Sequence, residues 1–383
     1  MRQKEILGRE LSTGRSILVT IENDIVTSIR RSEEMAALWI SAGLVDLQVN
    51  GYLGLDLNGP DLTSATVSKL ARALLATGVT TFAPTVITAP EGAMRERIAC
   101  IAEACAQDPI AAACIPYIHV EGPYISSREG YRGAHAADCV RPPSLAEFAQ
   151  WQACCDGRVG LVTLSPHFPG SREYIYALRQ QGVHVSLGHT HASQEEIQSA
   201  VHAGARLSTH LGNGIALQID RHPNPIWSQL AENRLTASFI ADGHHLPSEV
   251  LTAMLRAKGL ERSILVSDLI ALAGMPPGRY VTPVGGAVEL TDTGRLTMEG
   301  TSTLAGAVLP LIACVGRAVQ MTGFSLAQVI SMTTESPGRF AGNRGRLRPG
   351  DRADIIRFDW DARESVAAVR DVWLAGEPVF TNT

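Results

Sequence analysis

Three segments of this chain end with a residue that could bind a metal ion. The run 118–124 is apolar up to Glu121 and is then broken by Gly-Pro, and two further strand-like runs end at His189 and at His210. A strand that ends in this way directs its last side chain out of the sheet and into the loops. One carboxylate and two imidazoles suit a catalytic zinc ion that keeps one coordination position open. The pattern therefore predicts a metal site built from three strand ends.

A fourth strand-like run ends in a carboxylate, Asp268. In a parallel α/β barrel the carboxyl ends of the strands carry the catalytic groups, so an acid in this position belongs with the three candidate ligands. Any one of these residues on its own is more often a paired structural group than a functional one. Their matching positions at four strand ends favour a shared catalytic site.

Length and composition favour a large folded chain with a small-molecule partner. The chain has 383 residues, of which 45% are hydrophobic, and this suits an eightfold α/β barrel with an appended unit. The formal net charge of -5 gives no basic surface of the kind that binds nucleic acid. No apolar run reaches membrane-spanning length, and the charged N-terminus lacks the apolar core of a signal peptide. We expect a cytoplasmic protein with neither a nucleic-acid nor a membrane partner.

The seven cysteines give no sign of a disulfide framework or of a second metal site. They are odd in number, they lie in apolar and helical contexts, and they form no Cys-x-x-Cys pair. We therefore expect reduced, structural thiols.

Strand-like and helix-like segments alternate through the middle of the chain. Residues 62–76 illustrate the helical pattern, with Val67, Leu70 and Leu74 on one face. This alternation is typical of a parallel sheet, and eight strand-like runs predict an α/β fold of the (β/α)8 TIM-barrel type. The runs span residues 45–51, 80–86, 117–123, 160–167, 184–190, 205–213, 236–245 and 263–269.

The two ends of the chain depart from this alternation. They contain short strand-like runs at residues 16–21, 25–29, 355–358 and 369–374. We expect residues 1–43 and 344–383 to form one small β-sandwich beside a barrel of residues 44–343. The Pro- and Gly-rich segment 273–278 is interpreted as a long loop after the eighth strand, in a position to cover the site.

Six short motifs around the candidate residues occur in a distinctive order. They are His119-Val120-Glu121-Gly122-Pro123-Tyr124, Gly188-His189-Thr190, Thr209-His210-Leu211-Gly212-Asn213, Asp242-Gly243-His244-His245, Leu265-Val266-Ser267-Asp268 and Thr303-Leu304-Ala305-Gly306. Together they resemble the N-acetylglucosamine-6-phosphate deacetylases of the amidohydrolase superfamily. The resemblance extends from Gly43 to Asp354, and the combination is specific although each motif is weak alone.

The resemblance implies a metal-dependent hydrolase of amide bonds. The three strand-end residues match the family's metal ligands, and Asp268 matches its general acid and base. Many amidohydrolases hold a second metal with His-x-His on the first strand; here the corresponding positions are Gln48 and Asn50, which are poor zinc ligands. We therefore expect vacant second-metal positions and one divalent ion per subunit, with zinc as the expected metal.

Two further histidines lie in loops that follow strands. His135, in Gly133-Ala134-His135, matches a family residue that helps to polarise the acyl oxygen. The fourth strand ends in Ser165-Pro166-His167, which lacks the lysine that bridges two metals in the hydantoinase and dihydroorotase branches and departs from the Pro-Glu of the deacetylases. We assign His167 no role beyond a structural or solvent-bonded imidazole.

The resemblance also implies a set of substrate-binding residues. They are Ala134, Asn213, Gly214, Arg221, His245, Leu304, Ala305 and Gly306. The arginine suits bidentate binding of a phosphate and is expected to reach across a homodimer. The chain reads Asn213-Gly214-Ile215 and Arg221-His222-Pro223-Asn224 where the family commonly reads Asn-Ala-Met and Arg-Glu-Pro-Gly. A different N-acyl sugar therefore stays open as the substrate.

The expected reaction is hydrolysis of the N-acetyl amide of N-acetylglucosamine 6-phosphate to glucosamine 6-phosphate and acetate. The same metal and carboxylate would serve an amidohydrolase that acts on another N-acyl amino sugar, an N-acyl amino acid or a cyclic amide, because only the pocket distinguishes them. A non-catalytic barrel, kept as a sugar sensor or assembly subunit, would be expected to have lost a ligand or the acid. All four residues are present, which favours an enzyme.

Overall fold

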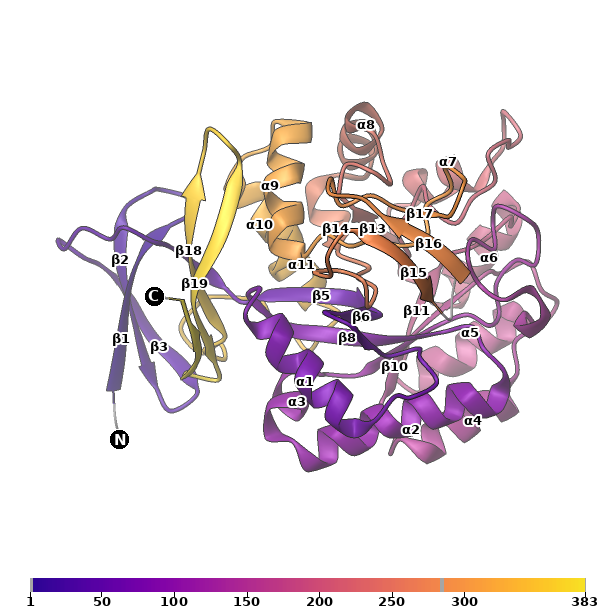
Figure 1. Ribbon diagram of the computed structural model, residues 1–383, viewed down its shortest axis with the longest axis horizontal. Helices are drawn as coiled ribbons and strands as arrows, with labels where there is room; N and C mark the ends of the chain where they lie inside the picture. The colour runs from indigo at the N-terminus through magenta and orange to yellow at the C-terminus, as the bar shows by residue number, and fades with distance from the viewer. Residues whose placement is uncertain (1–2, 283–285, 383) are drawn as a thin grey trace.

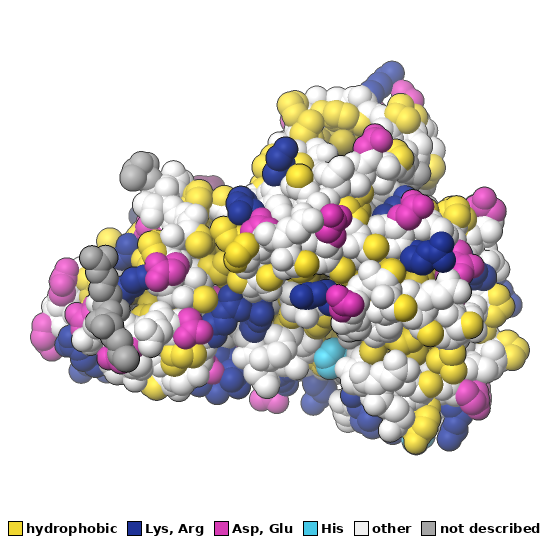
Figure 2. All heavy atoms as spheres, turned by 90° about the horizontal axis from the view of Figure 1, so that it is seen from below, with side chains coloured by type: hydrophobic (Ala, Val, Ile, Leu, Met, Phe, Trp, Pro, Cys, Tyr) yellow, Lys and Arg dark blue, Asp and Glu magenta, His cyan; other side chains and the backbone are white. Residues whose placement is uncertain are grey.

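A computed structural model describes residues 3–282 and 286–382. Figure 1 shows an α/β barrel and, beside it, a β-structure to which both ends of the chain contribute. Figure 2 shows that basic and acidic side chains lie among one another over most of the underside. No helix within the described ranges is both long and apolar enough to cross a membrane.

Eight parallel strands form the barrel and follow one another in sequence order. They are β5 (Leu44–Val49), β8 (Val79–Ile87), β9 (Ile118–Glu121), β10 (Val159–Leu164), β11 (His184–Leu187), β12 (Leu207–Ser208), β13 (Thr236–Ile240) and β14 (Ser263–Val266). A parallel bridge between Val49 and Leu269 connects the end of β5 with the segment after β14. The predicted (β/α)8 fold and its eight strands are therefore confirmed.

Helices cover the outside of the barrel because each buries one apolar face against the strands. In α1 (Ser64–Leu75), the residues Val67, Leu70 and Leu74 are buried as the periodicity predicts, and the side chain of Thr63 caps the first turn. The other helices are α2 (Glu91–Gln107), α3 (Pro109–Cys114), α4 (Leu145–Cys154), α5 (Ser171–Gln180), α6 (Gln194–Ala203), α7 (Pro225–Ala231), α8 (Ser248–Lys258), α9 (Leu311–Thr322), α10 (Leu326–Thr333) and α11 (Glu335–Gly338). All seven cysteines are free.

The two ends of the chain form one seven-stranded sheet, in the order β20-β19-β18-β4-β1-β2-β3. Its strands are β1 (Gln3–Glu10), β2 (Ser16–Glu22), β3 (Ile25–Arg31), β4 (Trp39–Ala42), β18 (Ile355–Asp361), β19 (Val366–Leu374) and β20 (Glu377–Thr381). Ile6, Val19, Ile40 and Ile355 pack into an apolar cluster that is separate from the barrel core. The expected association of the two termini is thus present.

A three-stranded antiparallel sheet follows the eighth barrel strand, and the sequence did not predict it. It consists of β15 (Gly278–Thr282), β16 (Gly286–Leu290) and β17 (Leu296–Met298). The segment interpreted as a loop therefore runs directly into a strand at Gly278. The strands are short and β15 is partly or fully exposed along its length, so they lack the apolar run that marks the barrel strands. A shorter hairpin, β6 (Gly51–Tyr52) and β7 (Leu55–Asp56), follows β5.

His184 lies at the amino end of β11, away from the strand ends that carry the candidate ligands. Its ring centroid is 6.2 Å from that of Tyr117 and 5.4 Å from that of Phe340. Burial, together with the charge of Arg179, lowers the pKa of His184 to about 4. The unfolded chain therefore binds a proton here more readily than the native protein does.

We expect His184 to make the protein less stable in acid. Because its native pKa lies below the unfolded value of about 6.5, its contribution is complete above that pH and is lost as the pH falls toward 4. The loss is up to about 3 kcal/mol. Urea unfolding between these pH values should show a flatter dependence in His184→Gln. His202→Gln, which changes an exposed histidine of α6, is the control; an unchanged slope in His184→Gln would contradict the assignment.

Candidate active site

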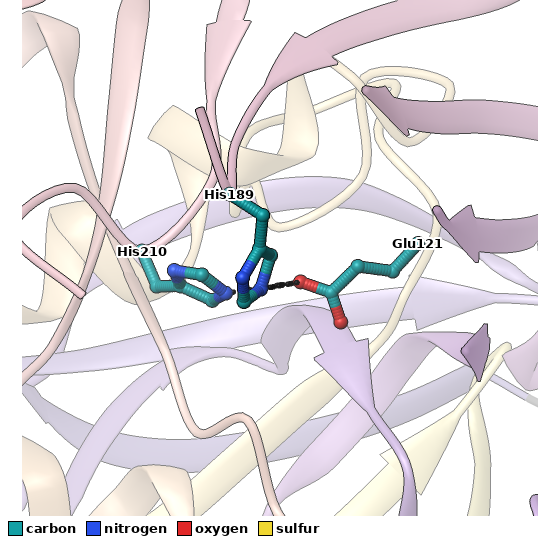
Figure 3. Close-up of side chains that lie close together, drawn as sticks. All are labelled: Glu121, His189 and His210. Atoms are coloured by element: carbon teal, nitrogen blue, oxygen red, sulfur yellow. Dashed lines mark hydrogen bonds and ion pairs between the residues drawn. The ribbon is translucent and has the colours of Figure 1, made fainter. Parts of the chain in front are cut away.

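The three candidate metal ligands converge at the carboxyl end of the barrel. Glu121 ends β9, His189 follows β11 and His210 follows β12. Their ligand atoms lie within 4.8 Å of one another, and all three residues are buried. Nε2 of His210 lies 2.9 Å and Nε2 of His189 lies 3.3 Å from Oε1 of Glu121. Figure 3 shows both rings directed toward the carboxylate.

Neighbouring groups hold the ligands in forms that suit a metal ion. Nδ1 of His189 donates to the carbonyl oxygen of Tyr131 at 2.9 Å, so Nε2 is left with its lone pair toward the cluster. Burial opposes ionisation of Glu121, but the neighbouring imidazoles of His189 and His210 hold the pKa of its carboxyl well below the usual value. An ionised carboxylate and two imidazoles at one point fit a divalent cation.

A glycine allows the close packing around His189. Gly214 has a φ of +59°, and a Cβ atom at this position would lie 2.6 Å from Nδ1 of His189. Any side chain would therefore have to displace the ring or shift the backbone. The departure from the family's Asn-Ala-Met at this position thus has a structural reason.

Asp268, the candidate general acid and base, follows β14 and is buried beside the cluster. Its Oδ1 accepts a hydrogen bond of 2.8 Å from Nδ2 of Asn50. Burial and the nearby carboxylate of Glu121 raise the pKa of Asp268 to about 7. Nε2 of Gln48 donates to Oε1 of Glu121 at 3.0 Å. The two residues in the expected second-metal positions therefore each hydrogen-bond a carboxylate of the site.

His135 lies against the cluster with its ring centroid 4.4 Å from that of His189. Burial and the neighbouring His189 lower the pKa of His135 to about 3, so the imidazole is neutral. Its Nδ1 lies 2.8 Å from the hydroxyl oxygen of Thr88. Thr88 was not identified from the sequence, because it is one of several threonines around β8 and no motif distinguishes it.

Comparison with known proteins agrees with this arrangement. Residues 39–379 match the model of the amidohydrolase family. The chain belongs to the amidohydrolase family. The resemblance inferred from the motifs is therefore confirmed, and the protein is a hydrolase of carbon–nitrogen bonds.

Its relatives include deacetylases of amino-sugar phosphates. An N-acetylgalactosamine-6-phosphate deacetylase of Escherichia coli O157:H7 is 30% identical over 374 residues, which cover 96% of this chain and 94% of that protein. A human N-acetylglucosamine-6-phosphate deacetylase is 32% identical and covers 89% of this chain and 83% of its own length. The solved structure of a mutant N-acetyl-D-glucosamine-6-phosphate deacetylase from Mycobacterium smegmatis, in complex with N-acetyl-D-glucosamine-6-phosphate, has a TM-score of 0.86 at 26% identity and covers 99% of this chain and 100% of that chain.

Most of the expected substrate-binding residues of this amidohydrolase lie around the cluster. The backbone N–H of Asn213 donates to the carbonyl oxygen of His210 at 2.9 Å. Residues 304–306 follow β17 and lead to Ala307, whose carbonyl oxygen accepts from the N–H of Ile270, two residues after Asp268, at 3.1 Å. His245 lies near enough to Asp268 to interact with its carboxyl group electrostatically. Ala134 is exposed beside His135.

Two of the singled-out residues lie apart from the cluster. Arg221 is exposed on the loop before α7, which projects from the barrel in Figure 1, and its guanidinium group has no partner in the described parts of the chain. His167 places Nδ1 2.6 Å from the hydroxyl oxygen of Ser165 and packs its ring 4.2 Å from that of His191. The side chains of Arg221 and His167 of the same subunit therefore take no part in the cluster of candidate metal ligands.

Proposed function

We propose that this amidohydrolase is an N-acetylglucosamine-6-phosphate deacetylase that releases glucosamine 6-phosphate and acetate. The observation that carries the proposal is the buried cluster of Glu121, His189 and His210 beside Asp268, in a chain whose relatives over most of its length bear this name. N-acetylgalactosamine 6-phosphate is a second candidate, because the Escherichia coli relative that aligns with 96% of the chain is named for it.

The mechanism follows from the stability of amides, whose carbonyl is a weak electrophile and whose amine is a poor leaving group. A bound divalent metal would polarise the carbonyl and bring the pKa of water to about 7. Asp268 accepts the proton of the attacking water and later delivers it to the departing nitrogen. Burial raises the pKa of Asp268, and a carboxylate with a raised pKa accepts a proton more readily.

His135 would stabilise negative charge on the acyl oxygen. A neutral imidazole can donate only one N–H, and this donor must be Nε2 if it is to reach the substrate while Nδ1 faces Thr88. The hydroxyl of Thr88 would then donate to Nδ1 at 2.8 Å rather than to the carbonyl oxygen of Glu121, which lies farther away at 3.5 Å. Thr88 is thus a positioning residue that selects the useful tautomer of His135.

We further propose a homodimer in which Arg221 serves the site of the partner subunit. Its loop carries Leu217, which is fully exposed, and Trp227 at the start of α7 is 55% exposed. Exposed large apolar side chains beside an arginine are typical of protein interfaces. A dimer interface at this loop would bury Leu217 and Trp227, and it would place an anion within reach of the guanidinium group of Arg221.

The metal proposal predicts one divalent ion, with zinc as the expected metal, in each subunit. Elemental analysis of the purified active enzyme should give about one equivalent. Glu121→Ala and His210→Ala should lose metal and activity together, whereas His202→Ala, in an exposed part of α6, should lose neither. Two equivalents of metal in the active enzyme would contradict the single-metal site.

Asp268→Asn tests the proton carrier. The amide keeps the shape of the side chain but cannot accept the proton, so turnover should fall by at least ~10²–10⁴. Metal content, measured on the same sample, should stay at the wild-type level because Asp268 is not among the three ligands. Turnover close to that of the wild type would exclude this role for Asp268.

The phosphate proposal predicts a strong preference between substrates. Charge-assisted contacts of roughly 1.5–3 kcal/mol each should make kcat/KM for N-acetylglucosamine about 10²-fold or more below that for its 6-phosphate. Arg221→Ala should reduce this preference, whereas Arg256→Ala, at an exposed position of α8, should preserve it. Acetate release from the galactosamine epimer distinguishes the second candidate. Equal use of both glucosamine derivatives by the wild type would show that phosphate is not recognised.

A further inference from the structure

A buried carboxylate determines how His245 is presented. Oδ2 of Asp242 accepts a hydrogen bond of 2.7 Å from Nδ1 of His245, and the two side chains are only 3% and 10% exposed. Oδ1 of the same residue accepts from the backbone N–H groups of His244 at 2.8 Å and His245 at 2.9 Å. Asp242 therefore fixes both the ring of His245 and the backbone that carries it.

This hydrogen bond leaves His245 with one ring atom for a ligand. An ionised carboxylate can only accept, so Nδ1 must carry a hydrogen, and no partner is found for Nε2 among the described residues. In the neutral ring Nε2 is an acceptor and repels an anion. Only the imidazolium form presents an N–H at this atom, so an anion bound there requires a second proton on the ring.

Charged and titratable groups from several elements face Asp242 and His245. Burial opposes ionisation of Asp242, but the hydrogen bond and charge of His245 and the backbone N–H groups of His245 and His244 together outweigh burial, and the pKa of Asp242 is lowered to about 2. The carboxylate of Asp268 also faces His245 electrostatically, and the buried thiol of Cys314 lies near Asp242. His244 takes no part, because its Nε2 lies 3.2 Å from the carbonyl oxygen of Thr293, between β16 and β17. Two carboxylates therefore act on one imidazole.

We propose that Asp242 is a positioning residue that makes His245 a proton-dependent binder of phosphomonoester dianions, so that a sugar phosphate binds together with a proton. This inference rests on the proposed function, because it takes the 6-phosphate of the substrate to lie at His245. It adds a role for Asp242, and it makes recognition of the anion depend on the protonation of one side chain.

Calorimetry on the metal-loaded wild-type enzyme tests the proton directly. The probe is glucose 6-phosphate, which has no acetamide to hydrolyse and no amine to titrate. At about pH 7.5 its phosphate is already a dianion, so proton uptake on binding must come from the protein. Titrations in buffers of different ionisation enthalpy should show net proton uptake in the wild type and close to none in His245→Gln. Binding without proton uptake in the wild type would overturn the proposal.

Asp242→Asn tests the positioning role. The amide can donate to Nδ1, which reverses the tautomer, so that the neutral ring carries its hydrogen on Nε2 and can donate to the phosphate without a second proton. We therefore expect proton uptake on binding of glucose 6-phosphate to fall close to zero in this variant although the ligand still binds, with little change in kcat/KM for the unphosphorylated sugar. Proton uptake equal to that of the wild type would contradict this role. If the variant does not fold, calorimetry on the wild type still tests the proton-dependent binding. If the wild type does not deacetylate the sugar phosphate, the proposed function is wrong, but proton uptake with glucose 6-phosphate can still be measured.

Discussion

The site depends on the contact of three side chains with one buried oxygen atom, Oε1 of Glu121. Two imidazoles and the amide of Gln48 all reach this atom from other strands. Glu121 could not remain ionised in the barrel interior without them, because a buried charge is costly unless it is paired and hydrogen-bonded. The parallel arrangement of β9, β11 and β12 satisfies this requirement, since it brings the carboxyl ends of three strands to the same rim. Fold and metal chemistry are therefore linked through one carboxylate.

The first barrel strand suits the proposed single-metal site. Gln48 and Asn50 stand in the expected second-metal positions, and each donates a hydrogen bond to a different carboxylate, Glu121 or Asp268. An amide donor holds a carboxylate without bringing a second charge. The two acids can then differ, because Glu121 is held ionised by imidazoles whereas Asp268 has a raised pKa. One acid is suited to bind a cation and the other to exchange a proton.

The sequence predicted those parts of the molecule that depend on local pattern. The eight strands were recognisable because apolar runs end abruptly at glycine, proline, histidine or aspartate, and the candidate ligands because they stand at those ends. The hydroxyl of Thr88, the contact of Gly214 with His189 and the sheet β15–β17 were not predictable in this way. The first two depend on distances between segments far apart in the sequence, and the third on short strands with little buried surface.

Two histidines of this site are suited to different roles, and the hydrogen-bond partner of each ring determines the role. His135 faces a hydroxyl group and is neutral, so it suits donation of a single hydrogen bond to a carbonyl. His245 donates from Nδ1 to a carboxylate with a low pKa, so its Nε2 carries a hydrogen only if the ring binds a second proton. A motif that records only the histidine cannot distinguish these cases, because the partner lies on another strand or several residues away. The residues that set the chemistry of this barrel therefore include Thr88 and Asp242, although neither is placed to react.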